Sequence, residues 1–122
     1  MYLWTIVGAG GFGLGMLVAP ETIRAAFGMP AQDPLMFGVA GSVFVAFAIL
    51  SILGFLSPLK FVPVLMLQLV YKVIWYLFVL LPAFVGGRVP MYGWILAGIF
   101  ATYVIGDLIA IPFSYVFERE AK

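Results

Sequence analysis

The chain is organised around the apolar stretch Val62-Pro-Val-Leu-Met-Leu-Gln-Leu-Val-Tyr-Lys-Val-Ile-Trp-Tyr-Leu-Phe-Val-Leu-Leu-Pro82. A helix that crosses a bilayer needs about 20 predominantly apolar residues, and this stretch is long enough. It carries Lys72 near its middle and Gln68 one helical turn earlier. A lysine at the centre of such a helix costs roughly 2.5 to 3.5 kcal/mol on insertion scales. We therefore expect Lys72 to pair with Asp107, the only acidic side chain inside another apolar stretch.

The composition of the whole chain is also that of a membrane protein. Of its 122 residues, 66% are hydrophobic and only 9% are charged, whereas soluble domains average about 25% charged residues. A chain of this length is expected to form one domain. The sequence therefore predicts a single all-α integral membrane domain, with the lipid bilayer as its surroundings.

Several function classes are excluded by what the chain lacks. It has no cysteine and no histidine, which are the usual ligands of zinc, copper and haem and, for histidine, the usual general base of nucleophilic triads. Its net charge of +1 comes from scattered residues and gives no basic run to follow a phosphate backbone. We expect no metal, no cofactor and no nucleic-acid partner. An enzyme that acts on a lipid or quinone stays open, but the sequence shows no recognisable nucleophile or set of metal ligands for it.

Four membrane spans and one short helix account for the remaining pattern. Pro20 and Gly28 are start and stop signals for a short helix, in which Ile23 and Phe27 share an apolar face. Such a helix is expected to lie in the membrane interface. The predicted architecture is a four-helix membrane bundle with spans at about 2–19, 35–56, 62–84 and 91–113 and an interfacial helix at about 20–28.

Small residues recur at four-residue spacing on three of these spans, as they do where membrane helices pack closely. The predicted packing stripes are Gly11 with Gly15, then Gly38, Ser42 and Ala46, and then Gly98, Thr102, Gly106 and Ala110. They serve either internal packing or assembly into a homo-oligomer. Gly8 to Gly13 also matches the glycine pattern of dinucleotide-binding folds, but the βαβ unit that this pattern requires is missing.

The loop charges bear on topology. Four crossings place both termini on one side, which then carries Lys60, Arg119 and Lys122 against Arg24 and Arg88 opposite. This bias of three to two favours cytoplasmic termini under the positive-inside rule. Arg24 is in addition a candidate ligand for lipid phosphate.

Counting from the turn between the last two spans gives the depth of each polar residue. Gln68 and Asp107 are each sixteen residues from that turn, or ~24 Å, and Lys72 is about one helical turn nearer to it. The lysine side chain leans toward the level of Gln68 and Asp107, because helical side chains point toward the N-terminus. Hydroxyls and aromatic rings are expected around this polar centre from Tyr71, Trp75, Tyr76, Thr102 and Tyr103.

Two interpretations of the polar centre remain open. In one, the pair of Lys72 and Asp107 is a buried structural link that fixes how the last two helices register. In the other, it lines a pocket that binds a small or lipid-like ligand or relays a proton, as intramembrane ionisable groups commonly do.

The layout resembles the DoxX-like group of small four-helix bacterial membrane proteins. The likeness rests on the glycine-rich first span, the segment from Pro20 to Gly28 followed by Met29-Pro30, and a second span that carries Gly38 and Gly41. The resemblance implies a bacterial cytoplasmic membrane protein that acts as an accessory subunit, sometimes with quinone-linked redox enzymes, and hence a membrane-protein partner or a quinone-like ligand. It supplies no catalytic residue.

The expected function is therefore that of an accessory subunit or a module that binds a small, lipid-like ligand. The alternative is a small proton-coupled transporter that works as a homo-oligomer. Small multidrug transporters share the length and the number of crossings, but they centre on a glutamate in the first helix, and the first span here carries no charge.

Overall fold

The structure is a computed structural model that describes residues 1–119, and within that range every regular element is helical. Lys122, which entered the charge comparison above, lies outside the described residues. The elements are α1 (Tyr2–Val18), α2 (Pro20–Phe27), α3 (Pro34–Leu56), α4 (Val62–Trp75), the π-helical turn η1 (Tyr76–Leu80), α5 (Leu81–Val85), α6 (Met91–Ala110) and α7 (Phe113–Val116).

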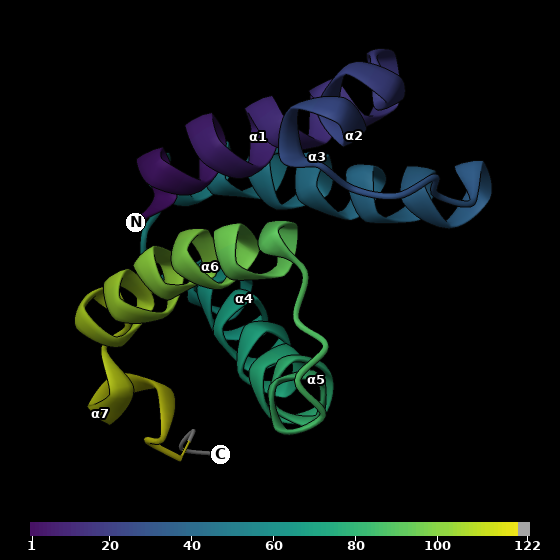
Figure 1. Ribbon diagram of the computed structural model, residues 1–122. Helices are drawn as coiled ribbons and strands as arrows, with labels where there is room; N and C mark the ends of the chain where they lie inside the picture. The colour runs from purple at the N-terminus through teal and green to yellow at the C-terminus, as the bar shows by residue number, and fades with distance from the viewer. Residues whose placement is uncertain (120–122) are drawn as a thin grey trace.

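Helices α1 and α3 form an antiparallel pair along one side of the molecule (Figure 1). Glycine lets their backbones approach closely, since a Cβ added at Gly13 would lie 2.8 Å from the carbonyl oxygen of Gly41. A Cβ at Gly10 would lie 3.0 Å from that of Ala48. This is the close approach that small residues permit between membrane helices.

The helical segment α4–η1–α5 and helix α6 form a second antiparallel pair (Figure 1). Their contacts run from Gln68 with Asp107 at one end to Phe84 with Trp94 at the other, where the ring centroids are 5.9 Å apart. The antiparallel neighbours expected for the last two spans are thus present.

The two pairs meet along the N-terminal half of α1. A Cβ at Gly8 would collide with the hydroxyl of Tyr103 on α6, so this tyrosine rests directly on the α1 backbone. The indole of Trp4 donates a hydrogen bond of 3.1 Å to Thr102, also on α6. At the same end of the fold, the hydroxyl of Tyr2 donates to the carbonyl of Pro58 at 2.6 Å.

Helix α2 turns away from α1 by 117°. It begins with Pro20 at its first position and ends at Gly28, whose φ of 68° is the left-handed conformation that glycine adopts without strain. Its apolar face packs back on α1, with Phe27 5.0 Å from Phe12 between ring centroids. The short helix predicted at about 20–28 is confirmed as a separate element.

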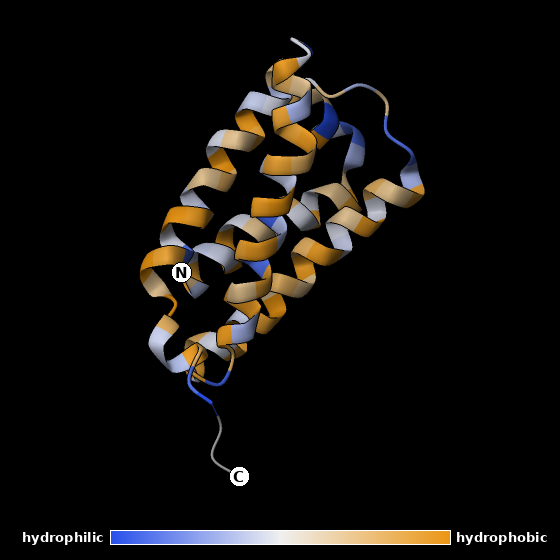
Figure 2. Ribbon diagram, turned by 90° about the horizontal axis from the view of Figure 1, so that it is seen from below, coloured by the Kyte–Doolittle hydropathy of each residue, from blue (hydrophilic) through white to orange (hydrophobic). Residues whose placement is uncertain are grey.

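Three helical segments within residues 1–119 are long and apolar enough to cross a membrane, namely Pro34–Leu56, Val62–Val85 and Met91–Ala110. Helix α1 reaches the required length only when it is counted together with α2, across the bend. Hydrophobic residues cover the long helices, while the strongly hydrophilic ones gather mainly in the connections and toward the C-terminus (Figure 2).

Two of the long helices are altered by proline: one contains a π-turn, and one ends earlier than predicted. Pro82 provides no N–H for the carbonyl of Phe78, and its ring crowds that carbonyl. The helix widens there into the π-turn of η1 and continues to Val85. The last span ends at Ala110 and not near residue 113, since Ile111 precedes Pro112 and is held extended, with ψ of 123°.

The predicted small-residue stripes are only partly used for packing. Nothing lies within 4 Å of a Cβ added at Gly11, Gly38 or Gly98, so these glycines face away from the other helices. The α1–α3 contact uses Gly10, Gly13, Gly41 and Ala48. Of the predicted stripes, Gly15 packs against Ile23 of α2 and Gly106 against Met1. Assembly into a homo-oligomer through the outward-facing residues stays a prediction.

Candidate functional site

Five polar or charged residues are buried in the described part of the chain, and they come from four helices. These residues are Thr5 on α1, Ser51 on α3, Gln68 and Lys72 on α4, and Asp107 on α6. A buried polar group in an apolar bundle is costly unless it is hydrogen-bonded. The partners of these side chains therefore define how the site is built.

Asp107 is held by Gln68. The Gln68 amide donates to both carboxylate oxygens of Asp107, at 3.2 and 3.0 Å, and Asp107 is fully buried. The Thr5 hydroxyl lies 3.1 Å from the Gln68 side-chain carbonyl oxygen and 3.1 Å from the backbone carbonyl oxygen of Met1, so its one proton is shared between two acceptors. The equal depth counted for Gln68 and Asp107 from the sequence agrees with these contacts.

The expected direct ion pair between Lys72 and Asp107 is not formed. Within residues 1–119 the only salt bridge is the one between Arg24 and Glu21, at 2.8 Å. Gln68 lies one turn before Lys72 at the depth of Asp107, and its amide donates to both carboxylate oxygens. The ammonium group is directed elsewhere.

Lys72 lies among aromatic side chains and is only 2% exposed. Its Nζ donates to the hydroxyl of Tyr71 at 2.8 Å. The same Nζ is 4.4 Å from the ring centroid of Tyr103, 5.1 Å from that of Phe100 and 6.0 Å from that of Phe47. Aromatic faces attract a cation within about 6 Å, so rings and one phenol stand where a carboxylate was expected.

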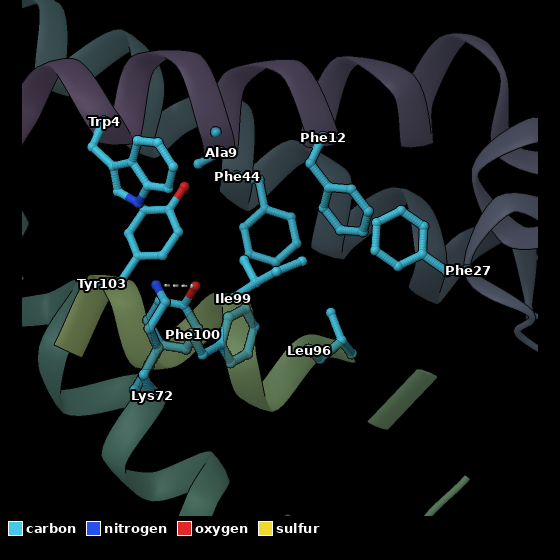
Figure 3. Close-up of a pocket in the computed structure, with 12 residues that line it drawn as sticks. Trp4, Ala9, Phe12, Phe27, Phe44, Lys72, Leu96, Ile99, Phe100 and Tyr103 are labelled. Atoms are coloured by element: carbon cyan, nitrogen blue, oxygen red, sulfur yellow. Dashed lines mark hydrogen bonds between the residues drawn. The ribbon is translucent and has the colours of Figure 1, made fainter. Parts of the chain in front are cut away.

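A cavity of about 280 Å³ lies between the two helix pairs, next to this ammonium group (Figure 3). Lys72, Tyr71 and Tyr103 form its polar end. The rest of the lining is almost entirely apolar and comes from α1, α2, α3 and α6: Trp4, Gly8, Ala9, Phe12, Phe27, Phe44, Leu96, Ile99 and Phe100. Lys72 is the only charged residue in this lining.

The other predicted site residues lie behind or beside the cavity. Gln68 and Asp107 form the buried network described above and do not line it. Trp75 packs against Phe100, with ring centroids 5.1 Å apart, and so supports the cavity wall. Tyr76 donates to the backbone carbonyl of Ala97. Thr102 accepts the hydrogen bond from the Trp4 indole and has no contact with Lys72 among those described.

Most of the lining was not predicted from the sequence. Aromatic residues are common in membrane helices, so Phe12, Phe27 and Phe44 carried no signal that set them apart. Thr5 could have been found, because a hydroxyl amid an otherwise apolar first span needs a partner. Ser51 is buried as well, and its hydroxyl has no hydrogen-bond partner among the described residues.

Arg24 is engaged within its own segment. Its guanidinium donates to Glu21 and, at 2.9 Å, to the backbone carbonyl of Met29, which closes the end of α2. Binding of lipid phosphate by Arg24 stays a prediction. The described residues contain no group of three metal-ligating side chains.

No family of known proteins, no curated protein and no solved structure matches this chain. The resemblance to the DoxX-like group therefore remains a prediction.

Proposed function

We propose that the chain is a four-helix integral membrane bundle that binds a small, lipid-like ligand in the cavity beside Lys72. In this proposal α1, α3, α4–α5 and α6 cross the bilayer, and α2 lies in its interface. The bend of 117° supports the separation of α1 from α2. At 17 residues, α1 is ~25 Å long, short of the ~30 Å hydrocarbon core by a few residues.

The exposed surface supports the membrane assignment. Large apolar side chains point outward from every long helix, among them Leu3, Val39, Leu67, Phe78 and Ile109. Soluble proteins rarely expose contiguous apolar surface of this extent. Hydrocarbon would cover it in a bilayer.

The observation that carries the ligand proposal is a buried ammonium at one end of an otherwise apolar cavity. Ligand pockets combine apolar walls with a few placed polar groups, and intramembrane ionisable residues are by default candidates for function. At about 280 Å³ the cavity is close to the lower limit of the ~300 to 1,000 Å³ usual for small-molecule sites. A quinone-like ring or a short acyl chain is the size of guest that we expect.

Binding is a better proposal than catalysis. The cavity lining offers one amine and two phenols but no carboxylate, thiol or aliphatic hydroxyl, so it holds no nucleophile paired with an activating base of the Ser–His or Cys–His kind. An accessory role follows naturally if the bound molecule is handed to a partner protein. On α3, the exposed small side chains of Ser42 and Ala46 then offer a surface for a partner helix or a second copy.

Proton-coupled transport is the second candidate. It is favoured by one observation, namely that a buried carboxylate and a buried amine lie one helical turn apart in depth on facing helices. Reconstitution in liposomes with an imposed proton gradient tests it. If none of a broad panel of substrates is taken up, transport is contradicted, and ligand binding remains as the proposed function.

The binding proposal is tested by extracting small molecules from the protein purified in mild detergent and measuring them by mass spectrometry. Ala9→Leu places a larger side chain in the cavity, and Ala26→Leu makes the same change at an exposed position of α2. We expect close to one guest per chain in the wild type and in Ala26→Leu, and a loss of several fold in Ala9→Leu. Equal amounts in all three proteins, or none above the detergent background, would contradict the proposal.

A further inference from the structure

We infer that the cavity selects apolar carboxylic acids over neutral molecules of the same shape, with the carboxylate held by Lys72 and Tyr71. This inference rests on the proposed ligand-binding function and specifies the chemistry of the ligand head group. It starts from the hydrogen bonds that these two residues leave unmade.

Two donors are available side by side at the polar end of the cavity. An ammonium has three N–H donors, and in the described part of the chain one of those of Lys72 is used, on the hydroxyl of Tyr71. That hydroxyl accepts from Lys72, so its own O–H remains free to donate. The two donor atoms are 2.8 Å apart and both belong to residues that line the cavity. A carboxylate, with its two oxygens on one carbon, is the head group that matches adjacent donors.

The charge of Lys72 also favours a carboxylic acid as the ligand. Lys72 forms no salt bridge within residues 1–119, and Asp107 is hydrogen-bonded to Gln68 instead. The aromatic rings of Tyr103 and Phe100 offer electron-rich faces to Lys72 but no negative charge. An anionic ligand would bring a carboxylate into direct contact with the ammonium, and charge-assisted hydrogen bonds are roughly twice as strong as neutral ones.

The apolar part of the ligand is constrained by the opposite end of the cavity. From Lys72 the walls continue past Ile99 and Phe44 to Phe12 and Phe27, with no further polar side chain along the way (Figure 3). A molecule with one acidic head and one apolar tail or ring fits this order. Phospholipids, which carry two chains and a bulky phosphate head, exceed the available volume of about 280 Å³.

The experiment presents detergent-solubilised full-length protein with an equimolar mixture of decanoate and methyl decanoate and measures both adducts by native mass spectrometry. The two probes share a chain and differ in charge. We expect the wild type to bind the acid at least about tenfold more tightly than the ester, a difference of ~1.4 kcal/mol. The preference should fall close to one in Lys72→Met and persist in Lys60→Met, which removes an exposed loop lysine.

Each outcome bears on a separate claim. If acid and ester bind equally to the wild type, the carboxylate inference is wrong and the ligand-binding function stands. If neither binds, the carboxylate inference is wrong, and extraction of bound small molecules decides whether the cavity holds another ligand. An acid preference that Lys60→Met abolishes as well would show that overall charge, and not the cavity, selects the acid. The wild-type ratio decides the inference even if Lys72→Met fails to fold.

Discussion

Gln68 and Asp107 join the two central helices α4 and α6 through a pair of hydrogen bonds, 3.2 and 3.0 Å long, from one amide nitrogen to both oxygens of one carboxylate. This contact links the helices where an ion pair with Lys72 was expected. Asp107 and Lys72, which the sequence predicted to pair, therefore lie in different surroundings. Asp107 is bonded to Gln68 between the helices, and Lys72 lines the cavity.

The first prediction concerns this contact. Gln68→Leu leaves a buried carboxylate without its donor, and Asp107→Leu leaves a buried amide without its acceptor, so each single change should destabilise the protein by at least about 1 to 3 kcal/mol. In Gln68→Leu with Asp107→Leu, both groups are gone, and the loss should be smaller than the sum by about 1 kcal/mol or more. Unfolding in mixed detergent micelles measures these free energies. Losses that simply add would contradict the contact.

The second prediction concerns Lys72. Because it has no ion pair in the described chain, Lys72→Met should be neutral or stabilising in ligand-free protein, as replacement of buried charges by well-packed apolar groups often is. A structural ion pair would give the opposite result, since leaving Asp107 unpaired would cost about 3 to 5 kcal/mol. Thermal unfolding in detergent distinguishes the two, with Lys60→Met as the control for loss of a lysine in a loop.

A third prediction tests the contact between α1 and α3. Cβ atoms in a disulfide are about 3.5 to 4.5 Å apart, and a Cβ at Gly10 would lie 3.0 Å from that of Ala48. Gly10→Cys with Ala48→Cys should therefore form a disulfide under mild oxidation with a small adjustment of the helices. The chain has no native cysteine, so protection from a bulky maleimide on a gel reports this bond alone. Gly11→Cys with Ala48→Cys should stay reduced.

The fourth prediction compares two glycines of α1. Gly13→Ala would place a methyl group 2.8 Å from the Gly41 carbonyl oxygen and should lower stability by about 1 to 3 kcal/mol through overpacking. Gly11→Ala meets no atom within 4 Å and should be neutral or stabilising, because alanine favours the helix by up to about 1 kcal/mol over glycine. Detergent melting temperatures of the two variants give the comparison. Equal decreases in the two melting temperatures would contradict the close approach of α1 and α3 at Gly13.

The sequence predicted the bounds of the helices better than it predicted which face of each helix packs against its neighbours. Apolar length and the proline and glycine signals placed α1, α2 and α3 to within one or two residues. The end of α6 was missed because Pro112 acts on the residue before it. The π-turn was not predicted, because the apolar pattern continues without a break up to Pro82 and does not show how the helix accommodates this proline.

For the candidate site, the sequence singled out the polar residues inside the apolar helices, but not which of these side chains are in contact. Lys72, Asp107 and Gln68 stand out because polar groups inside apolar spans are costly wherever they lie. Which of them touch depends on the rotation of each helix, and hydrophobic periodicity does not define rotation when all faces are apolar. The cavity depends on side chains from four elements, such as Phe12, Phe27 and Leu96, and no local pattern brings these together.

The most direct test of the central claim is a structure determined from protein kept in native lipid. We predict density for a guest molecule within hydrogen-bond distance of the Lys72 Nζ, extending along Ile99 toward Phe12, with Asp107 still bonded to Gln68. A cavity closed by side chains, with Lys72 bonded to Asp107, would contradict the claim that this site binds a ligand.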